Sequence, residues 1–278
     1  MHNAALAHLA GRDPRFATWR YVALDCPPGD LAAALSALHA RGFRGVNLTV
    51  PHKVLAVGMV RSIEPAAAAA GAVNTLRREE SGWRGFNTDG YGLARSVRQD
   101  LGIELRGTPV IIAGAGGAAR GAALECLRAG CAALWVVNRS PANQTALLEQ
   151  VRSLAGAIPL AGLGPDDPVP EFPPGTLLIN ATSAGLRASD PSPVVLARLA
   201  GVSAVYDMIY NPPRTRLLDE AAALGLRTQN GLGMLVHQGA KALELWTGAP
   251  AEELAPIMRA AAAKALGSAP GSGADSGP

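Results

Sequence analysis

The sequence predicts an α/β protein with two α/β domains, and three observations support this. An apolar run at 110–113 leads into a glycine-rich turn and then an alanine-rich segment with helical spacing, which is the order strand, turn, helix. A second apolar run, at 133–137, follows at the spacing of one βαβ unit. Strand-like and helix-like segments also alternate before residue 100, which predicts a first domain with a mostly parallel sheet.

The first part of the chain divides into short segments with recognisable boundaries. Gly42 and Gly71 follow apolar helical patterns, as expected of glycines at helix C-termini, and Pro51 closes a strand. The expected helices cover residues 1–10, 31–41 and 65–70, with one more after residue 89, and the expected strands cover 19–24, 45–50, 71–76 and 83–86.

Polar side chains gather at three of these strand ends, in the segments 47–53, 74–75 and 87–89. Taken singly, each has an ordinary explanation: Lys53 as a solvated surface lysine, Asp89 as a helix N-cap and Asn74 as a turn residue. Three such clusters at strand ends are harder to explain by structure alone, because ligands of α/β sheets bind at these edges.

The glycine turn has the spacing of a dinucleotide-binding fingerprint, Gly114-x-Gly116-x-x-Ala119. Gly114 permits the tight turn, Gly116 leaves room for a pyrophosphate, and Ala119 lets the helix approach the strand. The helix N-terminus offers N–H groups and the positive end of its dipole to phosphates. A turn that only packs remains the alternative, but the following strand favours a Rossmann-type domain.

The strand at 133–137 ends at Asn138, Arg139 and Ser140. NAD-binding domains usually carry an acidic residue there, which holds the ribose 2′-hydroxyl. A guanidinium would instead bind a 2′-phosphate, so Arg139 favours NADP over NAD.

The rest of the chain continues the same alternation and ends in two helices. A polar loop at 180–185 follows a strand, near the place where a nicotinamide ring would lie. The expected strands cover 176–179 and 202–208, and the expected helices 141–154, 214–224, 232–246 and 251–266. The tail 267–278 is rich in Gly, Ser and Pro, and we expect it to be disordered.

The composition of the 278 residues is that of a globular protein, with 49% hydrophobic and 17% charged residues. No apolar run is long enough to span a bilayer and no signal peptide is recognisable, which predicts a cytoplasmic protein. The net charge of +3 is spread along the chain and favours a small acidic ligand over nucleic acid. The three cysteines lack metal-ligand spacing, so we predict free thiols and no metal site.

At several of these segments the chain resembles the shikimate dehydrogenase family. The motifs are N-L-T-V-P-H-K, A-V-N-T, N-T-D-G, G-A-G-G-A-A, N-R-S, N-A-T-S-A-G, D-M-I-Y-N-P and M-L-V-H-Q-G-A, in the family's order. The resemblance covers nearly all of residues 1–266. It implies NADPH-dependent, reversible reduction of 3-dehydroshikimate to shikimate, in the pathway to chorismate and the aromatic amino acids. It also implies a substrate domain at 1–92, a Rossmann domain at 93–231 and helices at 232–266 that return to the substrate domain.

The resemblance also implies roles for single residues. Lys53 and Asp89 match the catalytic pair. The residues that match substrate ligands are Thr49, Asn74, Asp89, Tyr210 and Gln238. The residues that match the cofactor site are Gly114, Ala115, Gly116, Gly117, Ala118, Ala119, Asn138, Arg139, Ser140, Thr182, Met208 and Gly231.

The chemistry agrees with these residue types. Lys53 can supply the proton that reaches the carbonyl oxygen and can stabilise a developing alkoxide, whereas an arginine would keep its proton. Asp89 can orient the ammonium group, and the Asn and Thr side chains suit a ring with several hydroxyl groups.

Two departures from the family's pattern leave alternatives open. Asn143 stands where a second arginine is usual, which predicts a weaker NADP preference and leaves a quinate/shikimate enzyme with some NAD use open. The family's first strand and its carboxylate-binding Ser-x-Ser turn would precede Met1, so we expect the functional chain to be longer. A dinucleotide-binding protein without turnover is the further alternative. A monomer or homodimer is expected.

Overall fold

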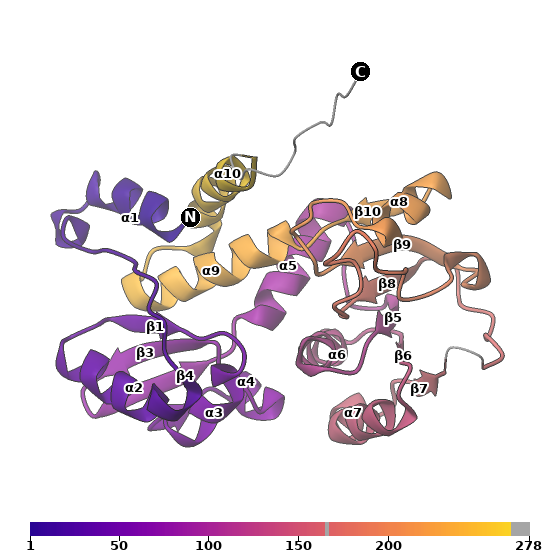
Figure 1. Cartoon of the computed structure of the whole chain (residues 1–278), viewed down its shortest axis with the longest axis horizontal. Coiled ribbons are helices and arrows are strands. Elements are labelled where there is room, and N and C mark those ends of the chain that lie inside the picture. Colours follow the sequence, from indigo (N-terminus) through magenta and orange to yellow (C-terminus); the bar gives the residue numbers. More distant parts are fainter. Residues whose placement is uncertain (165–166, 268–278) are drawn as a thin grey trace.

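The computed structural model describes residues 1–164 and 167–267, which form two sheets joined by long helices (Figure 1). The first sheet lies in the N-terminal part of the chain and the second in the part from β5 onward. The α/β class with a Rossmann-type second half is therefore confirmed. The tail predicted to be disordered covers 267–278: Gly267 is instead the last residue of α10, and residues 268–278 lie outside the described residues.

The first sheet has four strands in the order β1-β3-β4-β2. Their bounds are β1 Gly45–Asn47, β2 Ser62–Ile63, β3 Thr75–Glu79 and β4 Gly82–Phe86. The prediction of a mostly parallel sheet is wrong for these strands: β1 with β3 and β3 with β4 are antiparallel, and only β2 with β4 is parallel. For β3 and β4 the reason is that only residues 80–81 join them, and so short a connection permits only a hairpin.

Four α-helices belong to the N-terminal part of the chain: α1 His2–Ala10, α2 Leu31–Ala40, α3 His52–Leu55 and α4 Pro65–Ala70. Single 3-10 turns lie at Pro14–Phe16, Pro28–Asp30 and Ala56–Gly58. Helix α2 packs its buried leucines on the first sheet, where the indole of Trp83 donates to the carbonyl of Leu35 at 2.9 Å. This contact fixes the helix over the sheet.

The predicted strand at 19–24 has no strand partner in the described part of the chain. Its backbone is held differently: the Asn3 side chain accepts from the Tyr21 N–H at 2.7 Å and donates to the Tyr21 carbonyl at 2.9 Å. These bonds replace strand pairing at this point, and Val22 and Leu24 remain 53% and 59% exposed. Alternation alone therefore misassigned this segment.

The second sheet has six parallel strands in the order β10-β9-β8-β5-β6-β7. Their bounds are β5 Pro109–Ala113, β6 Ala133–Val137, β7 Leu160–Leu163, β8 Thr176–Asn180, β9 Val202–Asp207 and β10 Arg227–Gln229. The helices of this part are α6 Gly117–Ala129, α7 Pro141–Ala155 and α8 Arg216–Ala223, with a 3-10 turn η4 at Leu196–Arg198. The strand order reverses between β5 and β8, which is where such sheets bind ligands.

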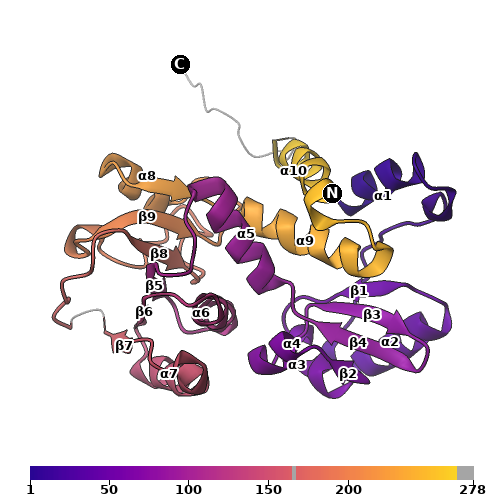
Figure 2. The same cartoon turned by 180° about the vertical axis from the view of Figure 1, so that it is seen from behind.

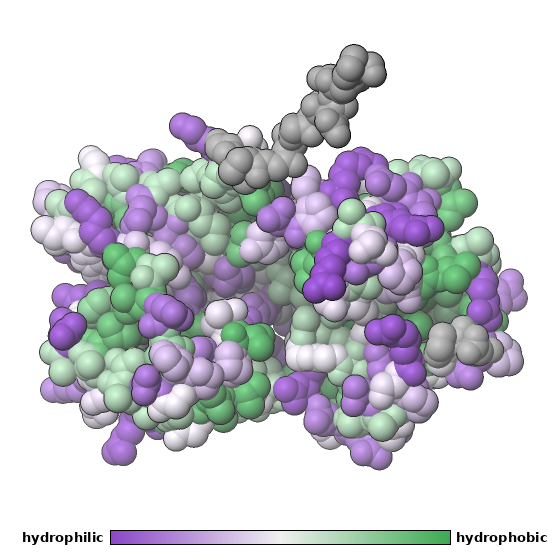
Figure 3. All heavy atoms as spheres, viewed as in Figure 1, coloured by the Kyte–Doolittle hydropathy of each residue, from purple (hydrophilic) through white to green (hydrophobic). Residues whose placement is uncertain are grey.

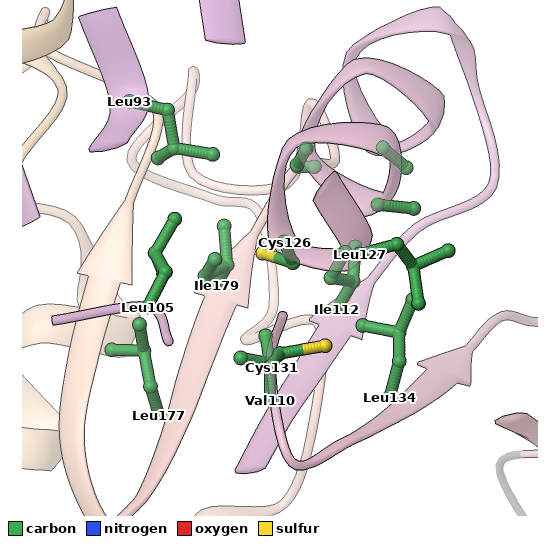
Figure 4. Packing of buried hydrophobic residues seen from close by; sticks show 14 of the residues in the cluster. Leu93, Leu105, Val110, Ile112, Cys126, Leu127, Cys131, Leu134, Leu177 and Ile179 are labelled. Carbon is green, nitrogen blue, oxygen red and sulfur yellow. The ribbon is translucent and has the colours of Figure 1, made fainter. Parts of the chain in front are cut away.

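The two faces of the second sheet pack against different layers because side chains alternate along each strand. Val110 and Ile112 of β5 point into one cluster with α6 and α7, whereas Ile111 points into the other with α8. Figure 4 shows the first of these clusters, in which Cys126 and Cys131 lie among aliphatic side chains. All three cysteines are free thiols, and burial raises the pKa of Cys131 to about 11.

Two long helices connect the sheets: α5 Asp89–Leu101 and α9 Leu232–Thr247, followed by α10 Ala251–Gly267. Figure 2 shows α5 and α9 side by side between the two lobes, and Figure 3 shows the furrow between these lobes at the surface. Helix α5 begins beside the first sheet, while Leu93 and Val97 lie in the core of the second. None of the described helices could cross a membrane.

Glycine allows the close contact between α5 and α9. A Cβ added at Gly92 would lie 2.7 Å from the Met234 carbonyl oxygen and 2.9 Å from Cβ of Gln238. At Gly233 an added Cβ would overlap the side chains of Ser96 and Asp100. Each helix therefore needs a glycine where it meets the other.

We expect Gly92→Ala to lower the free energy of unfolding by about 1–3 kcal/mol, because a methyl group would be forced against the backbone of α9. Gly121→Ala in α6 is the matched control, since a Cβ there meets nothing within 4 Å. The control should raise stability by about 0.5–1 kcal/mol, as alanine does in a helix. Denaturant unfolding measures both, and equal stability of the two variants would contradict the close packing.

Candidate active site

A lysine and a carboxylate meet at the edge of the first sheet. Lys53 lies in α3, which begins just after β1, and Asp89 is the first residue of α5. The Nζ atom of Lys53 lies 2.7 Å from Oδ2 of Asp89. The two side chains are 25% and 23% exposed, so the ion pair is accessible from the surface.

Asn74 fixes the other oxygen of Asp89. Its amide nitrogen donates to Asp89 Oδ1 at 2.8 Å and to Thr88 Oγ1 at 3.0 Å, and its amide oxygen accepts from the Thr88 N–H at 2.9 Å. Asn74 is 2% exposed, and its neighbour Thr75 also donates to the amide oxygen at 3.0 Å. Every hydrogen-bonding position of this amide is used, so the carboxylate has one orientation.

Three strand and helix ends bring this cluster together. The side chain of Asn47, at the end of β1, donates to Thr75 Oγ1 at 3.0 Å. Asn87, after β4, accepts from the Asp89 N–H at 3.0 Å and so orders the start of α5. The predicted grouping of the three polar segments is therefore seen in the structure.

The other predicted substrate residues lie at different distances from this pair. Thr49 is joined to Lys53 through its backbone, since its carbonyl accepts from the Lys53 N–H at 3.2 Å. Gln238 faces α5 at Gly92, and its amide donates to the Leu235 carbonyl at 2.9 Å. Tyr210 follows β9 of the second sheet and is 37% exposed. No described contact joins Tyr210 to the lysine and carboxylate.

A cleft of about 590 Å³ opens at the carboxyl edge of the second sheet. The predicted cofactor residues that line it are Gly114, Ala115, Gly116, Asn138, Arg139 and Thr182. The remaining ones, which do not line it, are Gly117, Ala118, Ala119, Ser140, Met208 and Gly231. Of these, Ala119 is a fully buried residue of α6, and Ser140 caps α7.

The glycine turn has the properties that a dinucleotide needs. Gly114 has φ +110°, and a Cβ there would lie 3.1 Å from the Ala181 carbonyl oxygen, so another residue would be strained. Gly116 is the N-cap of α6 and makes no side-chain cap, which leaves the first N–H groups of the helix for a ligand. A Cβ at Gly116 would meet nothing within 4 Å, so the backbone is open to an approaching pyrophosphate.

Arg139 lies at the rim of this cleft and is exposed. The preceding Asn138 is held by a bond from its amide to the Ser140 carbonyl at 2.9 Å. The cleft has one further cation among its described residues, Arg198, and one carboxylate, Asp190. Asp190 accepts from the Gly185 and Arg187 N–H groups, which lowers its pKa. The positive charges at the rim fit the phosphates of NADP.

Two buried residues of this edge received no role from the sequence. Asn180 and Asp207 end the neighbouring strands β8 and β9, pair in register, and are both fully buried. In the sequence each of them is a polar residue at the end of an apolar strand. Their pairing could have been predicted only from the order of the strands in the sheet, which the sequence does not show directly.

Comparison with known proteins supports the resemblance. The family description "Shikimate dehydrogenase substrate binding domain" matches residues 1–76, and "Shikimate 5'-dehydrogenase C-terminal domain" matches residues 231–262. A shikimate dehydrogenase (NADP(+)) of Geobacter metallireducens is 40% identical over 250 residues, which cover 89% of this chain and 85% of the relative.

Solved structures show the same fold. A ligand-free 5-ketofructose reductase of a Gluconobacter strain has a TM-score of 0.79 at 35% identity, covering 92% of this chain and 91% of its own. The shikimate 5-dehydrogenase of Thermus thermophilus, in complex with NADP(H) and shikimate, has a TM-score of 0.74 at 34% identity, covering 93% and 94%. The chain belongs to the shikimate dehydrogenase family.

Proposed function

We propose that this chain is an NADP-dependent shikimate dehydrogenase, an oxidoreductase that reversibly reduces 3-dehydroshikimate to shikimate. The observation that carries the proposal is the Lys53–Asp89 pair, at 2.7 Å, held by Asn74 at an accessible sheet edge. The glycine turn and Arg139 line a second cleft that suits NADP. The relatives of known name support the same reaction.

The nicotinamide supplies a hydride for the carbonyl carbon when NADPH is bound. The residues of the chain supply the proton for the carbonyl oxygen and a positive charge that stabilises this oxygen. The ammonium of Lys53 delivers a proton to the carbonyl oxygen and stabilises the negative charge that develops there. Asp89 holds that ammonium through Oδ2, while Asn74 holds Asp89 through Oδ1. In the oxidation direction the same lysine takes the proton back.

We also propose the division of labour among the remaining residues. Thr49 and Gln238 offer hydroxyl and amide groups to the substrate, with Tyr210 approaching from the second sheet. The predicted role of Asn74 is indirect: its amide is fully bonded, so it acts on the substrate by holding Asp89. Residues 1–92 then form the substrate domain, 93–231 the cofactor domain, and 232–266 the helices that return. The contact between α9 and β3 of the first sheet agrees with this return, since Trp246 donates to the Leu76 carbonyl at 2.9 Å. Cytoplasmic location and a monomer or homodimer remain predictions.

Two other readings have an observation behind them. Asn143 stands four residues after Arg139, where the family usually carries a second arginine, which favours some use of NAD and of quinate. The likeness to the 5-ketofructose reductase shows that this fold is also found in an enzyme named for a different substrate.

The deciding experiment compares turnover across substrates and cofactors. Shikimate, quinate and 5-ketofructose are each offered with the appropriate NADP or NAD form, and nucleotide absorbance is followed. We expect the highest kcat/KM for shikimate with NADP. A higher value for another substrate would replace the proposed specificity. Binding of NADPH without turnover of any substrate would identify a dinucleotide-binding protein.

A further inference from the structure

The ends of β8 and β9 are joined by an amide and a carboxylate. Asn180 and Asp207 are register partners in the parallel sheet. The Asn180 amide donates to Asp207 Oδ1 at 2.9 Å, and both residues are 0% exposed. This pair, the Asn180–Asp207 bridge, lies directly below the two loops that continue from the strands.

The carboxylate of the bridge holds the loop after β9 at both of its ends. Asp207 Oδ1 also accepts from the Ile209 N–H at 3.0 Å, and Oδ2 accepts from Thr215 Oγ1 at 2.6 Å. Thr215 is the N-cap of α8. The loop at 208–215, which contains Tyr210, is therefore fixed to one carboxylate.

The amide of the bridge holds the loop after β8 in the same way. Its oxygen accepts from the Thr182 N–H at 3.0 Å and from Thr182 Oγ1 at 2.7 Å. Its nitrogen donates to the Ala184 carbonyl at 3.3 Å. Residues 181–184 line the cleft that we assign to NADP, and Ala181 and Thr182 also lie against the glycine turn at Gly114.

A buried carboxylate is costly unless its oxygens are satisfied. Burial raises the pKa of Asp207, while its three donors act in the opposite direction. An apolar pair at these positions would avoid that cost, so stability alone gives little reason for the bridge. A fully bonded network does, however, allow only one arrangement of the groups it joins.

We propose that Asn180 and Asp207 are positioning residues, which hold the two loops so that the nicotinamide half of NADP is bound in one orientation. The inference rests on the proposed function for the identity of the cofactor. A dinucleotide crosses the point between β5 and β8 where the strand order reverses, so its adenosine half lies over β5 to β7, on the side of Arg139, and its nicotinamide half over β8 and β9. The inference therefore predicts that damage to the bridge weakens binding of the nicotinamide half and spares binding of the half at Arg139.

The test uses two variants and a matched control. Asn180→Asp places a second carboxylate against Asp207, and Thr215→Val removes the donor to Oδ2 with little change of shape. Gln150→Glu makes the same amide-to-carboxylate change on the exposed surface of α7. Each protein is titrated with NADPH and with adenosine 2′,5′-bisphosphate, which lacks the nicotinamide half, and melting temperatures are recorded.

For Asn180→Asp we expect NADPH affinity to fall about 10-fold and kcat about 100-fold, because small misplacements of reacting groups cost this much. Affinity for the bisphosphate should stay within about twofold, and the control should match the wild type. Thr215→Val should lower the ratio of NADPH affinity to bisphosphate affinity by a smaller factor. If Asn180→Asp does not fold, Thr215→Val is the variant that tests the inference.

One result would overturn the inference: a ratio of the two affinities that is unchanged in both variants, whether neither ligand loses affinity or both lose it equally. Failure of the proposed function is a separate result. A wild type that binds NADPH but turns over no 3-dehydroshikimate would refute the activity, while the ratio of affinities would still report on the bridge.

Discussion

Replacing Lys53 by alanine should lower kcat by roughly 10²–10⁴-fold, because the variant loses both the proton donor and the charge that stabilises the alkoxide. Affinity for NADPH should change little, since Lys53 lies in α3 beside the first sheet, whereas the glycine turn follows β5 of the second. Steady-state kinetics and a nucleotide titration measure the two effects separately.

Two further variants separate the roles of the lysine. Lys53→Arg keeps the positive charge beside Asp89 but does not readily give up a proton, so its kcat should remain low. Lys264→Ala removes an exposed lysine of α10 and should have wild-type kcat. A Lys53→Ala enzyme with nearly normal kcat would show that another group delivers the proton.

Exchange of Arg139 for aspartate should reverse the cofactor preference. The change removes charge-assisted hydrogen bonds to the 2′-phosphate, worth about 1.5–3 kcal/mol each, and places a repelling carboxylate there. We expect the ratio of kcat/KM for NADPH to that for NADH to fall at least about 100-fold, which corresponds to roughly two such bonds. The new carboxylate can accept from the ribose hydroxyls of NADH.

Arg152→Asp provides the matched charge reversal on the exposed surface of α7, outside the cleft. Its cofactor ratio should equal that of the wild type. If Arg139→Asp also left the ratio unchanged, the guanidinium would not contact the 2′-phosphate, and the selection of NADP would have to come from another residue of the cleft.

Much of the second sheet could be predicted from sequence because its strands are buried on both faces. Such strands are continuous apolar runs, and β5, β6, β8 and β9 were all expected within two residues of their bounds. The glycine turn needs particular residues for steric reasons, so its spacing is informative even in one sequence. The Lys53–Asp89 pair was predicted from the polar residues at strand ends together with the family resemblance.

The errors have physical causes. Strand β3 was expected at 71–76 but lies at Thr75–Glu79, because its second half is polar and gives no apolar signal. Strands β2, β7 and β10 are two to four residues long, too short for a periodic pattern. The antiparallel direction of β3 and β4 follows from the two residues that join them. Because β3 was expected to end at residue 76, the predicted connection was longer and did not indicate a hairpin.

The way the chain crosses between the sheets has a consequence for engineering. In the sequence, all strands of the second sheet lie between α5 and α9. These two helices are antiparallel, as shown by the contacts of Gly92 with Gln238 and of Asp100 with Gly233. The exit at the end of α5 and the return at the start of α9 therefore lie next to each other. A segment whose two ends are adjacent can be exchanged as a single cassette with two junctions. Residues 102–230 could thus be replaced by the equivalent segment of an NAD-using relative while the Lys53–Asp89 pair is kept.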